Sequence, residues 1–163
     1  MKTAIFIGRF QPFHKAHLQD IKLTLKDCER IIIAIGSSQE SHTRQNPFTY
    51  EEREEMVENT LKADNIQNYC IIPVPDINDD ERWVDHVKKI VPEFNVVYTG
   101  NEKTERLFKE KDIKVKKIKL THGISATIIR HKIIKGDDWK DLVPEEISTY
   151  IENIKGVNRI RSI

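Results

Sequence analysis

The stretch Ile7–His17, IGRFQPFHKAH, carries one arginine and two histidines directly after a short apolar run. Gly8 allows a backbone to approach a ligand closely, and Arg9 adds a permanent positive charge. His14 and His17 are three residues apart and share one face if a helix begins there. Because a helix N-terminus favours anions over cations, the pattern predicts a phosphate-binding turn. The alternatives are a metal held by both histidines, or a capping His14 beside a core-packed His17.

A second candidate anion site lies near the C-terminus, in the stretch GISATIIRHKI. Ser125 and Thr127 have hydroxyls that bond either the free N–H groups of a helix start or a phosphate. Arg130 follows Thr127 by three residues and so lies on the same helix face. A capped helix with an exposed arginine is the alternative interpretation.

Two further turns hold polar residues after apolar runs. Arg44 and His42 lie in GSSQESHTRQNPFT, which is either a loop that closes on ligand phosphates or a solvated polar loop. Gly100 and Asn101 follow the run VVYT, where they could approach a ribose or base. A simple turn explains Gly100 and Asn101 equally well.

The stretch PVPDINDDERW combines acidic residues with an aromatic side chain. Asp76, Asp79 and Asp80 precede Trp83, and acidic residues at a helix start complement its dipole. Trp83 fits a stripe of apolar residues and therefore suits core packing. The functional interpretation is an aromatic face beside hydrogen-bond acceptors, which suits a flat heteroaromatic ring carrying an amide.

Apolar runs alternate with amphipathic segments along the whole chain. Runs rich in Ile and Val predict strands at 3–8, 30–36, 69–75, 95–100 and 114–120. Helical spacing predicts helices at 14–27, 48–63, 81–91, 101–111 and 125–135, with a last one from near Pro144 to near Gly156. We expect one α/β domain over 1–163, with a doubly wound, Rossmann-like parallel sheet flanked by helices. Continuous apolarity at 30–36 indicates a strand covered on both faces, and the lysines at 114–120 indicate an edge strand.

The composition and the absence of certain motifs argue against several classes of protein. The formal net charge of +1 argues against nucleic-acid or membrane binding through a general field. Two cysteines without C-x-x-C spacing suggest neither a disulfide framework nor a zinc site. The chain has no P-loop motif and no G-x-G-x-x-G after the first strand. No apolar run reaches about 18 residues, and the first is too short for a signal peptide, so we expect a cytoplasmic protein.

The motifs taken together resemble a known family. GRFQPFHKAH and GISATIIR resemble the two motifs by which the HxGH nucleotidyltransferase superfamily holds ATP. Within it, GRFQPFH, SHTRQNPFT, DINDDERW and VVYTGN, in this order, resemble archaeal-type nicotinamide-nucleotide adenylyltransferases. That family joins ATP to nicotinamide mononucleotide, and commonly to nicotinate mononucleotide, with release of pyrophosphate. The resemblance also implies a homo-oligomer.

The resemblance implies a role for each matching residue. His17 would stabilise the transferring α-phosphate, and His14, Arg9, Arg44 and Arg130 would bind phosphates. The implied ATP-binding set is Gly8, Arg9, Phe10, His14, His17, Gly100, Asn101, Ser125, Thr127 and Arg130. The implied nicotinamide mononucleotide set is Asp76, Ile77 and Trp83, with Trp83 stacking on the ring. Two positions depart from the family pattern, because Ala16 replaces the HxGH glycine and His131 stands where relatives often carry a second arginine.

The expected mechanism is direct in-line attack by the 5′-phosphate of the mononucleotide on the α-phosphorus of ATP. A phosphate is already ionised at neutral pH, so positioning and electrostatics suffice without a general base. Mg²⁺ would accompany ATP, held mostly by the nucleotide and water rather than by a protein site. Alternatives are another nucleotidyltransferase of the superfamily, acting on phosphopantetheine, FMN or glycerol phosphate, or a nucleotide-sensing module without turnover.

Overall fold

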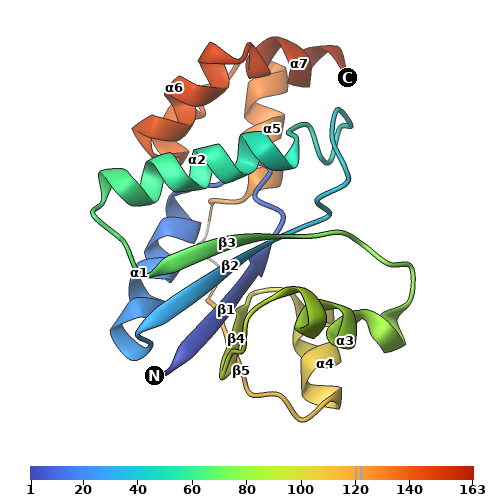
Figure 1. The fold of residues 1–163 in the computed structure, drawn as a ribbon. Coiled ribbons are helices and arrows are strands. Elements are labelled where there is room, and N and C mark those ends of the chain that lie inside the picture. Colours follow the sequence, from blue (N-terminus) through green and yellow to red (C-terminus); the bar gives the residue numbers. More distant parts are fainter. Residues whose placement is uncertain (120, 122) are drawn as a thin grey trace. The chain divides into compact units, whose positions relative to one another are not determined.

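The computed structural model describes residues 1–119, 121 and 123–163, and it contains the expected parallel sheet. The strands are β1 Thr3–Gly8, β2 Arg30–Gly36, β3 Tyr69–Val74, β4 Val96–Thr99 and β5 Val115–Lys117. Their order is β3-β2-β1-β4-β5, and all neighbours pair in parallel (Figure 1). The order reverses between β1 and β4, as in a doubly wound sheet. The fold prediction is therefore confirmed.

The helices follow the sequence pattern closely. They are α1 Lys15–Asp27, α2 Tyr50–Ala63, α3 Asp80–Ile90, α4 Glu102–Glu110, α5 Ala126–Lys135, the 3-10 turn η1 Lys140–Leu142, α6 Glu145–Asn153 and α7 Gly156–Ser162. The N-terminus of α2 is a capping box, because Thr49 and Glu52 each accept the other's backbone N–H through their side chains. No helix within the described residues is long and apolar enough to cross a membrane.

The predicted last helix, from near Pro144 to near Gly156, corresponds to α6, and α7 follows it as a helix that the sequence did not predict. Lys155 adopts a left-handed backbone with φ of 58°, which breaks the chain between α6 and α7. Gly156 then lies so close to its neighbours that a Cβ there would be 2.9 Å from Ile151 Cγ2 and 3.1 Å from Phe48 Cε1. A side chain at Gly156 does not fit this packing.

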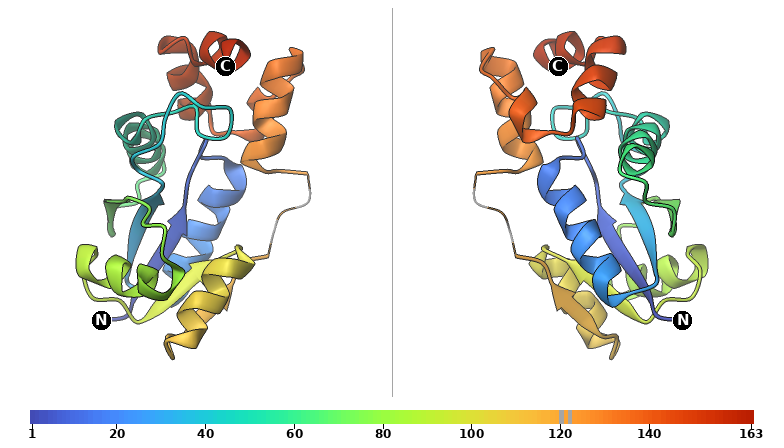
Figure 2. Two further views of the ribbon diagram at one scale, coloured as in Figure 1. Left: turned by 90° about the vertical axis from the view of Figure 1, so that its right-hand side faces the viewer. Right: turned by 90° about the vertical axis from the view of Figure 1, so that its left-hand side faces the viewer.

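The chain forms two compact units. The first comprises Met1–Gly8, Asp20–Ser38 and Asn68–Leu120, and holds the sheet with α3 and α4. The second comprises Arg9–Gln19, Gln39–Gln67 and Thr121–Ile163, and holds α2 and the helices from α5 onward. Within the second unit, α6 packs on α2 and α7 packs on α5 and α6 (Figure 2). A single domain over 1–163 stays a prediction.

The core of the first unit lies between the sheet and the helices α3 and α4. Its fully or almost fully buried members are Ile5, Ile32, Ala34, Val74, Val84, Val87, Val91, Val97, Leu107 and Phe108. The five residues 31–35 of β2 are all buried, which confirms a strand covered on both faces. β5 lies at an edge, as predicted, but it is shorter than the run 114–120, and Leu120 lies outside the described residues.

Candidate active site

The loop between β1 and α1 is fixed by its own polar side chain. Gln11 is buried, and its amide bonds the Phe48 backbone twice, donating to the Phe48 carbonyl at 3.1 Å and accepting the Phe48 N–H at 2.9 Å. Phe10 and Phe13 are also buried, and Phe10 has a left-handed φ of 54°. A bulky residue rarely adopts this conformation, so the surroundings must impose it. The loop is therefore a rigid platform for the side chains it carries.

The two predicted histidines form one stacked pair at the start of α1. Their ring centroids are 3.6 Å apart, and the rings are 18° from parallel. The His14 N–H donates to His17 Nδ1 at 3.2 Å, and the His17 N–H donates to His14 Nδ1 at 3.4 Å. Both Nδ1 atoms are thus acceptors, which places the proton of each neutral ring on Nε2. Each ring carries an N–H donor suited to a phosphate oxygen.

Both histidines are uncharged in the ligand-free protein at neutral pH. Burial lowers the pKa of His14 from 6.5 to about 4. Burial, and then repulsion from His14, lower the pKa of His17 well below its usual value. The Phe10 and Phe13 rings flank His17, with centroids at 4.8 and 5.3 Å from its ring. His14 caps the turn, as the alternative interpretation expects, while His17 packs among these rings and is half-buried, so its role at a phosphate stays a prediction.

The low pKa of His14 predicts a pH-dependent stability. In the unfolded chain His14 titrates near 6.5, whereas in the folded protein it titrates near 4. Between these values the unfolded state binds more protons, so the free energy of unfolding should fall with falling pH by about 1.4 kcal/mol per unit for one histidine. Urea unfolding of the ligand-free protein at several pH values measures this slope. His14→Asn keeps an acceptor for the His17 N–H and should reduce the slope; an unchanged slope would contradict the prediction.

Arg130 reaches the same loop from α5. It is buried, and its Nη1 donates to the Gln11 carbonyl at 2.8 Å while its Nη2 donates to Thr127 Oγ1 at 3.4 Å. Arg9 is exposed, and its Nη1 donates to Asn46 Oδ1 at 3.3 Å. Burial, and then the positive charge of Arg9, lower the pKa of Arg130. No carboxylate among the described residues pairs with either arginine.

The remaining candidates of the second unit have simple structural roles or exposed positions. The Ser125 hydroxyl accepts the Ile128 N–H at 3.1 Å and caps α5. Arg44 is exposed at the tip of a turn that Thr43 and Asn46 close through two hydrogen bonds. Ala16 is buried in the first turn of α1, and His131 is exposed. The structure therefore links Arg130 and Thr127 to the loop that carries Arg9 and His14, His17 follows in the first turn of α1, and Arg44 is exposed on its turn.

The other predicted residues lie in the first unit. Trp83 on α3 is half-buried and packs edge-to-face on Phe108, with ring centroids 5.6 Å apart. Asp76 is exposed and Ile77 half-buried in the segment between β3 and α3. The Pro75 carbonyl of this segment lies 2.9 Å from Nε2 of His86, also on α3.

Gly8 and Gly100 each lie at or just beyond the carboxyl end of a strand. Gly8 ends β1, and Gly100 follows β4. The Asn101 side chain accepts the Thr104 N–H at 2.9 Å and caps α4. The turn interpretation therefore describes Asn101 correctly, and a nucleotide role for it stays a prediction.

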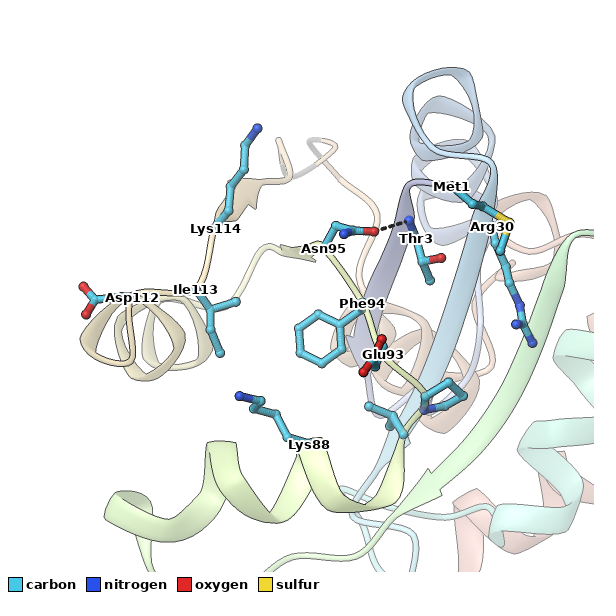
Figure 3. A pocket seen from close by; sticks show the side chains of 12 residues that line it. Met1, Thr3, Arg30, Lys88, Glu93, Phe94, Asn95, Asp112, Ile113 and Lys114 are labelled. Carbon is cyan, nitrogen blue, oxygen red and sulfur yellow. Dashed lines mark hydrogen bonds between the residues drawn. The ribbon is translucent and has the colours of Figure 1, made fainter.

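A cavity of about 960 Å³ in the first unit contains none of the predicted site residues. It lies at the amino-terminal ends of the strands, beside Thr3, Arg30 and Asn95 (Figure 3). Asn95 Oδ1 accepts the Thr3 N–H at 2.7 Å, and Phe94 lies among the lining side chains. Ligands of parallel α/β sheets bind at the carboxyl ends, so we assign this cavity no part in catalysis.

Three residues of the site escaped the sequence analysis: Gln11, Asn46 and Arg53. Gln11 and Asn46 each bond a partner 37 positions away in sequence. Local sequence patterns do not predict pairs that are so far apart. Arg53 had a signal, because it occupies the first position of a buried stripe on α2 that continues at Met56 and Val57. An arginine at a core-facing helix position is unusual enough to attract attention.

Comparison with known proteins defines the class. Residues 5–132 match the cytidylyltransferase-like family. The matched residues include residues of all five strands of the parallel sheet and the loop that carries Arg9 and His14. A bifunctional NMN adenylyltransferase/ADP ribose pyrophosphatase from Francisella tularensis, complexed with AMP and a manganese ion, is structurally similar. The TM-score is 0.84 at 25% identity, over 99% of this chain and 52% of that one. The chain therefore spans about half the length of that bifunctional protein.

Closer relatives identify the family within this class. The chain is 44% identical over 162 residues to a protein of Thermoplasma volcanium, covering 98% of this chain and 91% of that one. It is 48% identical over 162 residues to a protein of Methanococcus maripaludis strain C5, covering 98% and 94%. A protein of Pyrococcus furiosus is 43% identical over 168 residues, covering 100% and 89%. All three are named nicotinamide-nucleotide adenylyltransferase, and this chain belongs to that family.

Proposed function

We propose that this chain transfers the adenylyl group of ATP to nicotinamide mononucleotide, giving NAD and pyrophosphate. One observation carries the proposal. The loop Arg9–His14 gathers two guanidiniums without a carboxylate partner among the described residues, and two neutral histidines whose Nδ1 atoms are already engaged. Such a set binds phosphate oxygens well, and it belongs to a chain whose full-length relatives carry this name.

The reaction needs no protein nucleophile. An oxygen of the mononucleotide 5′-phosphate forms a bond to the α-phosphorus of ATP, and the bond from that phosphorus to the bridging β-phosphate oxygen breaks. The electron pair leaves with pyrophosphate. His17 stabilises the charge on the α-phosphate, and His14, Arg9 and Arg44 hold the phosphate chain. Ser125, Thr127 and Arg130 bind the β- and γ-phosphates, while Gly8, Phe10, Gly100 and Asn101 complete the ATP site.

Mg²⁺ enters this reaction as part of the MgATP substrate. The side chains gathered at the loop are guanidiniums and imidazoles, whereas Mg²⁺ prefers carboxylate, phosphate and water oxygens. The phosphate chain itself is therefore the chief ligand of the ion. The Francisella tularensis relative was crystallised with a manganese ion, so both metals belong in the assay.

The acceptor pocket is proposed to consist of Asp76, Ile77 and Trp83, with the pyridine ring against Trp83. Trp83→Ala should raise the KM for nicotinamide mononucleotide roughly 3- to 10-fold, the value of one aromatic stacking contact, and leave the KM for ATP nearly unchanged. Steady-state kinetics with each substrate varied in turn measures both constants. Phe108→Leu is the matched control, because it removes the packing partner of Trp83 but keeps the indole. An equal rise of both KM values in Trp83→Ala would indicate core packing instead.

A panel of acceptors tests the reaction itself. Purified protein is mixed with ATP and Mg²⁺ or Mn²⁺, and pyrophosphate release is followed with nicotinamide mononucleotide, nicotinate mononucleotide, FMN, phosphopantetheine or glycerol 3-phosphate. Release with the pyridine mononucleotides, with the dinucleotide identified as product, supports the proposal. Release with another acceptor alone would contradict the Trp83 pocket and keep the phosphate site. ATP binding without release from any acceptor would favour a sensing module.

We further propose that the two units work as one nucleotidyltransferase domain in a cytoplasmic homo-oligomer. The family resemblance supports this assembly. Light scattering on the purified protein measures its mass, and a monomer at assay concentrations would contradict it.

A further inference from the structure

Arg53 is the largest completely buried side chain among the described residues. It lies on α2, at the start of the stripe that continues through Met56, Val57, Thr60 and Leu61 into the core. A guanidinium stays charged at any physiological pH, and burying it is costly unless its N–H groups are bonded. Hydrophobic packing alone would be served better by leucine or methionine at this position. The hydrogen-bond partners of the guanidinium must therefore explain why an arginine occupies this buried position.

Three of the bonds of Arg53 lead to separate carbonyl groups. Nε donates to the Thr49 carbonyl at 3.2 Å, Nη1 to the Arg9 carbonyl at 2.9 Å and Nη2 to the Glu40 carbonyl at 3.4 Å. Thr49 is the N-cap of α2, and Arg9 opens the loop that carries the phosphate-binding side chains. One planar guanidinium thus joins α2 to the loop after β1 and to the segment before Arg44. No other side chain type offers donors in this fixed fork.

The bond to Arg9 falls next to the left-handed residue of the loop. The Arg9 carbonyl belongs to the peptide that precedes Phe10, whose left-handed φ of 54° the surroundings must maintain. This peptide also sets the direction in which the Arg9 side chain leaves the backbone toward Asn46. A guanidinium that holds the Arg9 carbonyl therefore limits where the Arg9 guanidinium can lie.

We propose that Arg53 is a positioning residue for adenylyl transfer, which fixes the Arg9 carbonyl and so holds the Arg9 guanidinium at the phosphate site. The inference rests on the proposed function, which assigns Arg9 to the phosphates of ATP. Arg53 touches no substrate in this account and acts only through Arg9. Its contribution should therefore appear in the kinetics with ATP and disappear when the Arg9 side chain is absent.

Arg53→Lys is the informative substitution, because a single ammonium keeps the charge and the aliphatic stem but cannot span three carbonyls. It should lower kcat/KM for ATP roughly 10- to 100-fold, as expected when a phosphate-binding group is misplaced by about 1 Å. Met56→Ala is the matched control, because Met56 lies one turn further along the same buried stripe. It should lower the melting temperature and keep kcat/KM within about two-fold at temperatures where it is folded. Thermal unfolding followed by circular dichroism fixes that range for both variants.

A double-mutant cycle separates positioning from a general loss of structure. In an Arg9→Ala background, Arg53→Lys should cost less than about two-fold further in kcat/KM, since residues that act through one another are not additive. The proposal is overturned if Arg53→Lys keeps wild-type kinetics, or if its full loss persists in the Arg9→Ala background. A wild-type kcat/KM in Arg9→Ala alone would overturn both the phosphate role of Arg9 and this inference. Failure of the reaction itself would appear earlier, in the acceptor panel with unmodified protein.

Discussion

Replacing His17 with alanine should lower kcat about 100- to 1,000-fold and leave most of the ATP affinity in place, as for other losses of one charge-stabilising donor. The expectation follows from the way the ring is held. Phe10, Phe13 and His14 surround it, and its Nδ1 accepts the His14 N–H, so the Nε2–H has one fixed direction. Because the Nε2–H of His17 is already oriented, no free energy is spent on turning it when negative charge develops on the α-phosphate. Pyrophosphate release measures kcat, and calorimetric titration with ATP measures binding.

Two variants make this experiment decisive. His17→Gln carries an amide N–H that can partly replace Nε2–H, so its kcat should lie between those of wild type and His17→Ala. His42→Asn is the matched control, because the exposed His42 ring bonds its neighbour Ser41, and asparagine keeps the backbone bond to Pro47 and tolerates the left-handed φ of 57°. A His17→Ala enzyme with near-normal kcat would remove His17 from the chemistry. An equal loss in ATP affinity would indicate that the ring serves binding alone.

The sequence predicted those parts of the fold that depend on local pattern. Continuous apolarity marked β2 as a buried strand, and the lysines around Val115 marked β5 as an edge strand. The capping box at Thr49 and Glu52 also has a short, fixed spacing. Each of these features depends on side chains a few positions apart. The end of the preceding helix near Gly156 was predicted but α7 was not, and its first residue depends on a tertiary contact, the close approach of Gly156 to Ile151 and Phe48.

The same distinction applies to the site. His14 and His17 were found because three residues along a helix start make them neighbours, and Arg130 was found because it follows a recognisable helix cap. Their electrostatic state could not be read from the sequence, since the low pKa values arise from burial in the folded protein. The core-facing position of Arg53 on α2 was a signal, but its partner Arg9 lies 44 positions away and no local spacing links the two. Local sequence patterns thus predicted the residues that are proposed to face the substrate. They did not predict the residues that hold those side chains in place.

Arg130 offers a second large effect, with a readout that distinguishes phosphate binding from loop structure. Arg130→Met should lower kcat/KM for ATP roughly 100- to 1,000-fold, because it removes a buried guanidinium that is held against the loop by its bond to the Gln11 carbonyl. Its proposed ligands are the β- and γ-phosphates, which ATP and pyrophosphate possess and AMP lacks. Binding of ATP and pyrophosphate should therefore weaken strongly, whereas binding of AMP should change little.

Comparing the binding of ATP, pyrophosphate and AMP also distinguishes a lost phosphate contact from a distorted loop. Arg130 donates to the Gln11 carbonyl, so its loss could distort the loop, and a distorted loop would weaken AMP as much as ATP. Lys135→Met is the matched control, since it removes an exposed positive charge from the last turn of the same helix, α5, and keeps the guanidinium on Gln11. It should affect ATP binding far less than Arg130→Met does. Parallel losses for AMP and ATP in Arg130→Met would assign Arg130 to the architecture of the loop and leave the β- and γ-phosphates to other groups.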